Sequence, residues 1–144
     1  MTKKSQKTFV IIDGNALIHR AYHAIPPLTA KDGTMVNAVY GFTSMLLKVL
    51  ADLKPDYIAA GGTFRDEVYT EYKATRVKAD DTLYDQIPLC YQVVEAFDIP
   101  IYVKKGFEAD DVIGTVAEQI KKEKKSVQSI IVSGDMDLLQ LVDD

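Results

Sequence analysis

The sequence predicts an α/β protein with a mostly parallel, twisted sheet that has helices on both faces. Short apolar runs rich in β-branched residues alternate with longer segments in which apolar residues recur every three or four positions. The short runs are typical of strands buried on both faces, and the longer segments of helices that cover them. Strands that alternate with helices form βαβ units and therefore a parallel sheet. The length of 144 residues predicts one domain over residues 1–144.

Four apolar runs are the predicted strands. The first stops at an Asp-Gly pair, and the fourth is followed by Gly134, so turn residues stand where these strands end. The predicted strands are Thr8–Asp13, Tyr57–Gly61, Ile99–Val103 and Ser129–Ser133.

The segments between and after these strands carry helical periodicity. Asn15 is expected to cap the first helix, Pro55 closes the second, and Pro88 is expected to kink or break the third. The fourth starts with acids and ends with lysines, as the helix dipole favours. The predicted helices are Asn15–His23, Asn37–Leu53, Asp81–Phe97, Glu108–Lys122 and Met136–Val142.

The composition restricts the compartment and the partners. The single cysteine, Cys90, excludes an intramolecular disulfide and favours a reducing compartment, where it is expected to be a buried small hydrophobe. The basic N-terminus precedes too short an apolar run for a signal peptide, and no stretch approaches the roughly 20 apolar residues of a membrane span. We therefore expect a cytoplasmic protein without a membrane partner. The net charge of −4 argues against a surface that is basic all over.

Three groups of acids follow predicted strand ends. The carboxyl ends of parallel strands share one edge of the sheet, where sites of open α/β proteins form. The acids are Asp13 after the first strand, Glu108, Asp110 and Asp111 after the third, and Asp135 and Asp137 after the fourth. We expect their side chains to converge.

Converging carboxylates call for a cation. Two of them 4 Å apart repel by about 4 kcal/mol at an effective dielectric constant near 20. Oxygen ligands without a nearby cysteine favour Mg²⁺ or Mn²⁺ over Zn²⁺. Two such ions can activate a water and stabilise the leaving oxygen of a phosphodiester.

A structural role is the alternative for each acid taken alone. Acids at a helix N-terminus are favoured by the dipole, Asp13 before Gly14 fits a turn, and Asp135 fits a helix cap. The three strand ends taken together favour a shared metal site. The pair His19 and His23, one helical turn apart, could also ligate a metal, but packing of that face against the sheet is the favoured interpretation.

A second pattern lies in residues 63–80, where bases and tyrosines recur every three to four positions. On a helix they would form one stripe, suited to grip phosphates and stack on unpaired bases of a 5′ end. A solvated helix with buried tyrosines is the alternative. The residues of the stripe are Arg65, Tyr69, Tyr72, Lys73 and Arg76.

Five motifs together resemble the PIN-like 5′-nuclease domain at the N-terminus of bacterial DNA polymerase I, over nearly the whole chain. The combination of Glu-Ala-Asp-Asp with Gly-Asp-x-Asp is highly specific. The motifs are Ile12-Asp-Gly-Asn-Ala-Leu-Ile-His-Arg-Ala-Tyr-His-Ala24, Thr63-Phe-Arg-Asp-Glu67, Tyr72-Lys-Ala-Thr-Arg76, Gly106-Phe-Glu-Ala-Asp-Asp-Val-Ile-Gly114 and Ser133-Gly-Asp-Met-Asp-Leu138.

The resemblance implies a divalent-metal-dependent 5′-3′ exonuclease and flap endonuclease that acts on DNA with a 5′ end or a 5′ flap. It places the six acids named above at two metal positions, and residues 63–80 in a helical arch. It implies that Tyr72, Lys73 and Arg76 contact the substrate, with Lys73 and Arg76 at the phosphate, and that Arg20 is another basic contact. Arg65 is expected to contact DNA because of its place in the basic stripe. It further implies a polymerase fused downstream in the parent protein.

Two departures from the family pattern affect this expectation. The family carries a Phe-Asp pair after the second strand, and that Asp belongs to its metal site, whereas here Ala59-Ala60-Gly61-Gly62 runs straight into Thr63. The family's C-terminal helix-hairpin region, which grips duplex DNA, is absent from the 144 residues. A catalytically impaired DNA-binding fragment is therefore the main alternative, and a PIN-type ribonuclease is a more distant one.

Overall fold

Four parallel strands form one sheet in the computed structural model, which describes residues 6–62, 81–103, 109–123 and 126–133. Their order across the sheet is β3-β2-β1-β4. The strands are β1 (Lys7–Asp13), β2 (Tyr57–Gly61), β3 (Ile101–Tyr102) and β4 (Val127–Val132). The predicted parallel α/β fold is confirmed, although β3 is shorter than expected. The predicted helix Met136–Val142 lies outside the described residues.

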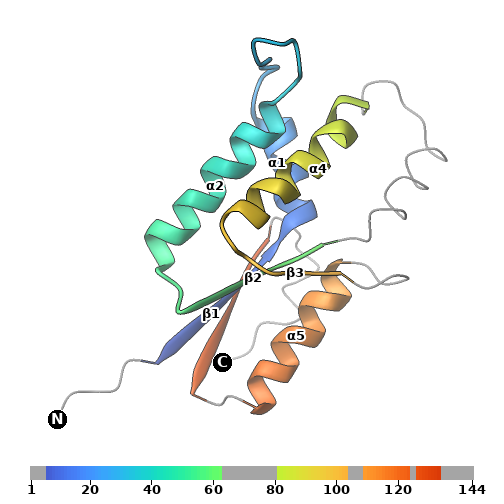
Figure 1. Cartoon of the computed structure of the whole chain (residues 1–144). Coiled ribbons are helices and arrows are strands. Elements are labelled where there is room, and N and C mark those ends of the chain that lie inside the picture. The colour runs from blue at the N-terminus through green and yellow to red at the C-terminus, as the bar shows by residue number, and fades with distance from the viewer. Residues whose placement is uncertain (1–5, 63–80, 104–108, 124–125, 134–144) are drawn as a thin grey trace.

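Helices cover both faces of this sheet. Figure 1 shows α1, α2 and α4 on one face and α5 on the other. The helices are α1 (Gly14–Ala24), α2 (Asn37–Leu53), α4 (Asp81–Ala96) and α5 (Ala109–Glu123). Among the described residues, no helix combines the length and the hydropathy that crossing a lipid bilayer requires.

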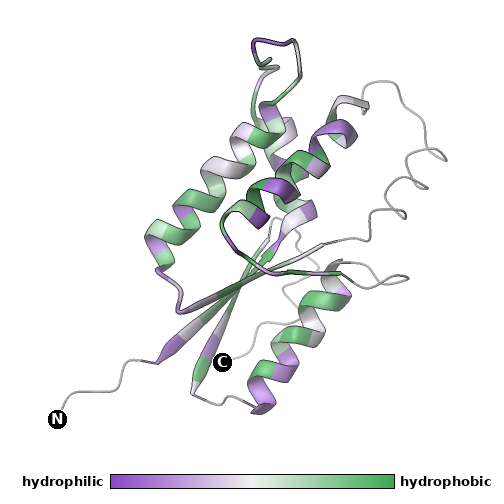
Figure 2. Ribbon diagram, viewed as in Figure 1, coloured by the Kyte–Doolittle hydropathy of each residue, from purple (hydrophilic) through white to green (hydrophobic). Residues whose placement is uncertain are grey.

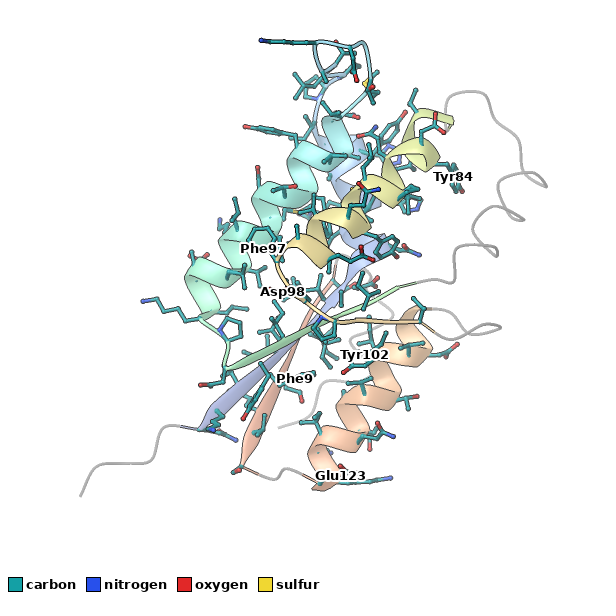
Figure 3. All side chains as sticks on the ribbon, in the orientation of Figure 1. Phe9, Tyr84, Phe97, Asp98, Tyr102 and Glu123 are labelled. Carbon is teal, nitrogen blue, oxygen red and sulfur yellow. The ribbon has the colours of Figure 1, made fainter. Side chains whose placement is uncertain are left out.

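The central strand β1 is buried on both sides, which explains its unbroken apolar sequence. Val10 and Ile12 pack into the larger core beneath α1, α2 and α4, whereas Ile11 packs with Ile113 of α5. This alternation follows from the two-residue period of a strand. Full burial of each such side chain contributes roughly 1.5–3 kcal/mol. Figure 3 shows side chains filling the layer between the sheet and the three helices. In Figure 2 the C-terminal end of α5, whose last turn contains Lys121 and Lys122, is hydrophilic.

One local prediction is wrong, and of the kink or break expected at Pro88 the break does not occur. The residue that caps α1 is Asp13, whose side chain accepts from the Ala16 N–H, and Asn15 already belongs to the helix. Helix α4 is also not broken at Pro88. Leu83 and Ile87 before the proline, and Cys90 and Val94 after it, are all buried in the larger core, and this burial outweighs the cost of one lost backbone hydrogen bond.

A buried glutamine joins the three helices on one face. The Gln86 Oε1 accepts from the backbone N–H groups of Ala38 and Val39, at 2.7 and 3.2 Å, and so caps α2, whose own N-cap residue makes no side-chain cap. Its Nε2 donates to the Oδ1 of Asn37 at 2.9 Å, and the Asn37 Nδ2 donates to two carbonyls at the end of α1. This network fixes the ends of α1 and α2 against α4.

Replacing Gln86 by Leu should lower the free energy of unfolding by about 2–4 kcal/mol, because buried N–H groups of α2 and the Asn37 amide lose their partners. Urea unfolding followed by circular dichroism measures this change. Gln92 is exposed on the same helix, so Gln92→Leu is the matched control and should change stability by no more than about 0.5 kcal/mol. Equal losses in both variants would contradict the role given to Gln86.

The expectation that Cys90 is a buried hydrophobe is confirmed. Burial raises the pKa of its thiol to about 12, from an ordinary value of 9.0. The folded state therefore holds the neutral thiol in a pH range where the unfolded chain releases the proton. The contribution to stability is fully present below pH 9.0 and is lost as the pH rises toward 12.

The Cys90 thiol should accordingly resist a disulfide reagent such as DTNB at pH 8 and react only after unfolding in urea. In addition, the midpoint of urea unfolding should fall more steeply between pH 9 and pH 11 in the wild type than in Cys90→Ala. Equally fast reaction of the folded and the unfolded chain would refute the assignment.

Candidate functional site

Asp13 stands at the carboxyl end of the central strand and is only 4% exposed. It pairs in register with Gly61 of β2 on one side, and on the other side Ile12 pairs with Val132, so Ser133 directly follows beside it. The connections to β2 and β3 run over one face of the sheet, and the connection to β4 runs over the other through α5. Ligand sites in open α/β sheets lie where the winding reverses in this way. Asp13 and Ser133 therefore occupy the switch point of the fold.

Two groups from the described part of the chain donate to the Asp13 carboxylate. Its Oδ1 accepts from the Ala16 N–H at 3.2 Å, in the first turn of α1, and its Oδ2 accepts from the Ser133 hydroxyl at 2.9 Å. The positive end of the helix dipole adds to both bonds. Because each carboxylate oxygen has two lone pairs, these bonds are compatible with a cation bound at the same group. The oxygen donors fit a hard divalent ion.

The second acid group begins α5. Asp110 and Asp111 lie in its first turn, Asp111 is exposed, and α5 packs against β1, β2 and β4. Since α5 follows β3, its first turn belongs to the carboxyl edge of the sheet, the edge that carries Asp13. The prediction that these acids follow strand three at a helix start is confirmed as far as Asp110 and Asp111 are concerned.

The remaining predicted site residues lie outside the described residues. They are Glu108, Asp135 and Asp137 of the acid cluster, and Arg65, Tyr72, Lys73 and Arg76 of the basic stripe. Within the described part of the chain, no group of three His, Cys, Asp or Glu residues could hold a metal ion. Convergence of all six acids thus stays a prediction.

The outer face of α1 carries Arg20, which is exposed, as a contact with DNA requires. His19 and His23 are exposed as well, so the interpretation that their face packs against the sheet is wrong. Helix α1 instead buries the face that contains Leu17, Ile18 and Ala21. The His23 ring lies edge-on to Tyr22, with 5.3 Å between the ring centroids.

Sequence reasoning missed two residues at this edge. The Ser133 hydroxyl orients Asp13, and the Tyr91 hydroxyl of α4 donates to the Asn15 Oδ1 at 2.7 Å. The signal for the second was Gly61-Gly62 at the end of β2, since glycine in or beside a strand often marks the close approach of another group. The signal for Ser133 was its place at the end of the fourth predicted strand, where it opens the Ser133-Gly-Asp-Met-Asp-Leu138 motif.

The fold and this edge define a doubly wound α/β domain with a carboxylate site at its switch point. Residues 8–144 match the family described as the 5′-3′ exonuclease N-terminal resolvase-like domain. The chain therefore belongs to this family, as its motifs indicated.

Similar proteins include DNA polymerase I of Chloroflexus aurantiacus, which is 45% identical over 141 residues, and that of Bacillus subtilis, which is 40% identical over 144 residues. The matches cover 94% and 96% of this chain but only 15% and 16% of the relatives. The chain thus spans about a sixth of the length of these polymerases.

Solved structures share the fold at low sequence identity. A T5 5′-exonuclease with bound divalent metal ions (zinc) has a TM-score of 0.68 at 17% identity, and it matches 96% of this chain and 53% of its own. A complex of the bacteriophage T5 flap endonuclease with DNA and metal ions has a TM-score of 0.62 at 18% identity, with the same coverage of both chains.

Replacing Ser133 by Ala should lower the free energy of unfolding by about 1–3 kcal/mol, because the buried Asp13 carboxylate loses a donor. Ser129→Ala, within β4, which Ser133 directly follows, controls for the loss of a serine hydroxyl and should have the smaller effect. Thermal unfolding of both variants at pH 7 gives the comparison. A larger loss for Ser129→Ala would contradict the orienting role of Ser133.

Proposed function

We propose that this chain is the metal-binding part of a 5′-3′ exonuclease and flap endonuclease that hydrolyses DNA phosphodiesters at 5′ ends. The observation that carries the proposal is the buried Asp13 carboxylate at the switch point, held by Ser133 and by the start of α1. A buried carboxylate at a ligand-binding edge is costly for a fold to keep unless it serves a ligand. Family membership supports the same activity.

The proposed cofactor is Mg²⁺ or Mn²⁺, in two positions. When bound, the ions supply an activated water and stabilise charge on the leaving oxygen. The divalent metal ions in the T5 5′-exonuclease structure support a divalent cofactor. The residues proposed to hold the ions are Asp13, Glu108, Asp110, Asp111, Asp135 and Asp137.

The proposed substrate is DNA with a 5′ end or a 5′ flap. Arg20 is exposed on α1, the helix that Asp13 caps, so a strand bound along this helix leads to the acids. Residues 63–80 are proposed to add an arch in which Arg65, Tyr72, Lys73 and Arg76 contact the strand. The T5 flap endonuclease complex with DNA supports this class of substrate.

The proposed organisation is a single PIN-like unit within a longer parent protein. The relatives are DNA polymerases I, of which the match covers about a sixth. We propose that the parent protein likewise carries a polymerase.

A catalytically impaired DNA-binding fragment is the second candidate, and one observation favours it. Strand β2 ends in Ala59, Ala60 and Gly61, followed by Gly62, so this strand end brings no side-chain oxygen to the edge. Where the family has an aspartate after the second strand, the proposed metal site is one ligand short.

The wild-type chain should release short 5′ products from a DNA flap in the presence of Mg²⁺, and Asp111→Ala should reduce the rate by about 100-fold or more, because a carboxylate of the metal site is removed. Asp52 is an exposed aspartate near the end of α2, at the opposite edge of the sheet. Asp52→Ala is therefore the matched control and should cleave like the wild type. Equal cleavage by all three proteins would end the proposal.

The same substrate separates the two candidates. An enzyme requires Mg²⁺ and turns over, whereas the impaired fragment binds the flap in the presence of EDTA and gives no product over hours. Gel-shift and cleavage assays on one flap, run side by side, give both readings.

A further inference from the structure

The Asp13 backbone is enclosed on the β2 side by an aromatic ring from α4. A side chain at Gly14, the next residue, would meet the Tyr91 ring at 3.6 Å and the Gly61 carbonyl oxygen at 3.3 Å. A Cβ atom on Gly62 would lie 2.5 Å from the Tyr91 hydroxyl, closer than real Cβ atoms come. The ring of Tyr91 thus fills the space that both glycines leave open beside the carboxyl ends of β1 and β2.

The Tyr91 hydroxyl extends this contact into α1. It donates to the Asn15 Oδ1 at 2.7 Å, across 76 positions of sequence, and both residues are partly buried. Asn15 lies between Asp13 and Ala16, the two residues joined by the N-cap bond. Any shift of Asn15 therefore moves the N–H group that holds the Asp13 Oδ1.

We propose that Asn15 and Tyr91 are a positioning pair that sets the place of the Asp13 carboxylate from the β2 side, opposite Ser133. The inference rests on the proposed function, since it assigns the pair to the metal site of that nuclease. At an edge where β2 supplies no side-chain oxygen, the pair supplies the rigidity that a ligand from β2 would otherwise give. Groups that orient metal ligands in this way typically affect metal affinity by 10–100-fold.

A second bond of the same kind provides the control. Helices α1 and α4 run antiparallel and are also joined at the other end of α1, where the Tyr22 hydroxyl and the Thr82 Oγ1 lie 2.7 Å apart. Tyr22→Phe and Tyr91→Phe each remove one tyrosine hydroxyl that joins α1 to α4 and keep the ring. Only the Tyr91–Asn15 bond lies beside Asp13, so general loosening of the helix pair and specific positioning give different results.

The test measures Mn²⁺ affinity by isothermal titration calorimetry, with thermal unfolding, for the full chain and four variants: Tyr91→Phe, Asn15→Ala, the double variant, and Tyr22→Phe. Tyr91→Phe should weaken Mn²⁺ binding about 10-fold, and Tyr22→Phe less than about twofold, at similar melting temperatures. The double variant should bind Mn²⁺ as Asn15→Ala does, because the two residues act as one unit.

The outcomes separate this inference from the proposed function. Equal Mn²⁺ affinity of the wild type and Tyr91→Phe overturns the positioning role and leaves the metal site standing. Equal weakening by Tyr91→Phe and Tyr22→Phe also overturns it, since the effect is then general. A wild-type chain that binds no Mn²⁺ overturns the proposed metal site and the positioning role with it.

Discussion

The rest of the site depends on one buried charge at the end of the central strand. Burying a carboxylate costs several kcal/mol unless donors replace the lost water. Asp13 obtains these donors from two different elements, the Ala16 N–H of α1 and the Ser133 hydroxyl after β4. The Asp13 carboxylate therefore joins the β1–α1 connection to the end of β4, 120 positions further along the sequence, and the site can form only when β1, β4 and α1 are in their native arrangement.

The topology explains why this charge lies where a ligand can reach it. Helices α1, α2 and α4 pack on one face of the sheet and α5 on the other, so the winding reverses between β1 and β4. No crossover helix covers the carboxyl ends of the strands at such a point. Asp13 ends β1 at this edge, and Asp111 lies in the first turn of α5, which covers the other face of the sheet.

The sequence predicts the bounds of elements that apolar periodicity and proline determine. It fails to predict which of two neighbouring polar residues caps a helix. Helix Asn37–Leu53 and strand Tyr57–Gly61 have the predicted bounds, because apolar spacing and proline fix them locally. The cap of α1 is predicted at Asn15, yet Asp13 takes it, because α1 already begins at Gly14, and the Asn15 side chain instead accepts from the Tyr91 hydroxyl of a distant helix. Pro88 shows a different limit of local reasoning: residues of α4 on both sides of the proline are buried in the core, and this burial outweighs the local cost of the proline.

The structure at the end of β2 determines how strongly the missing family aspartate affects the proposed metal site. Six acids remain in the proposed cluster, and their six negative charges exceed the four positive charges of two divalent ions. The absence of the family's aspartate after β2 therefore lowers the repulsion among the ligands as well as their number. What the missing residue takes away is geometry on the β2 side, where Gly14 and Gly62 leave a space that the Tyr91 ring occupies. Activity then depends on whether a ring and an amide can hold Asp13 as firmly as a carboxylate bound to the same metal would.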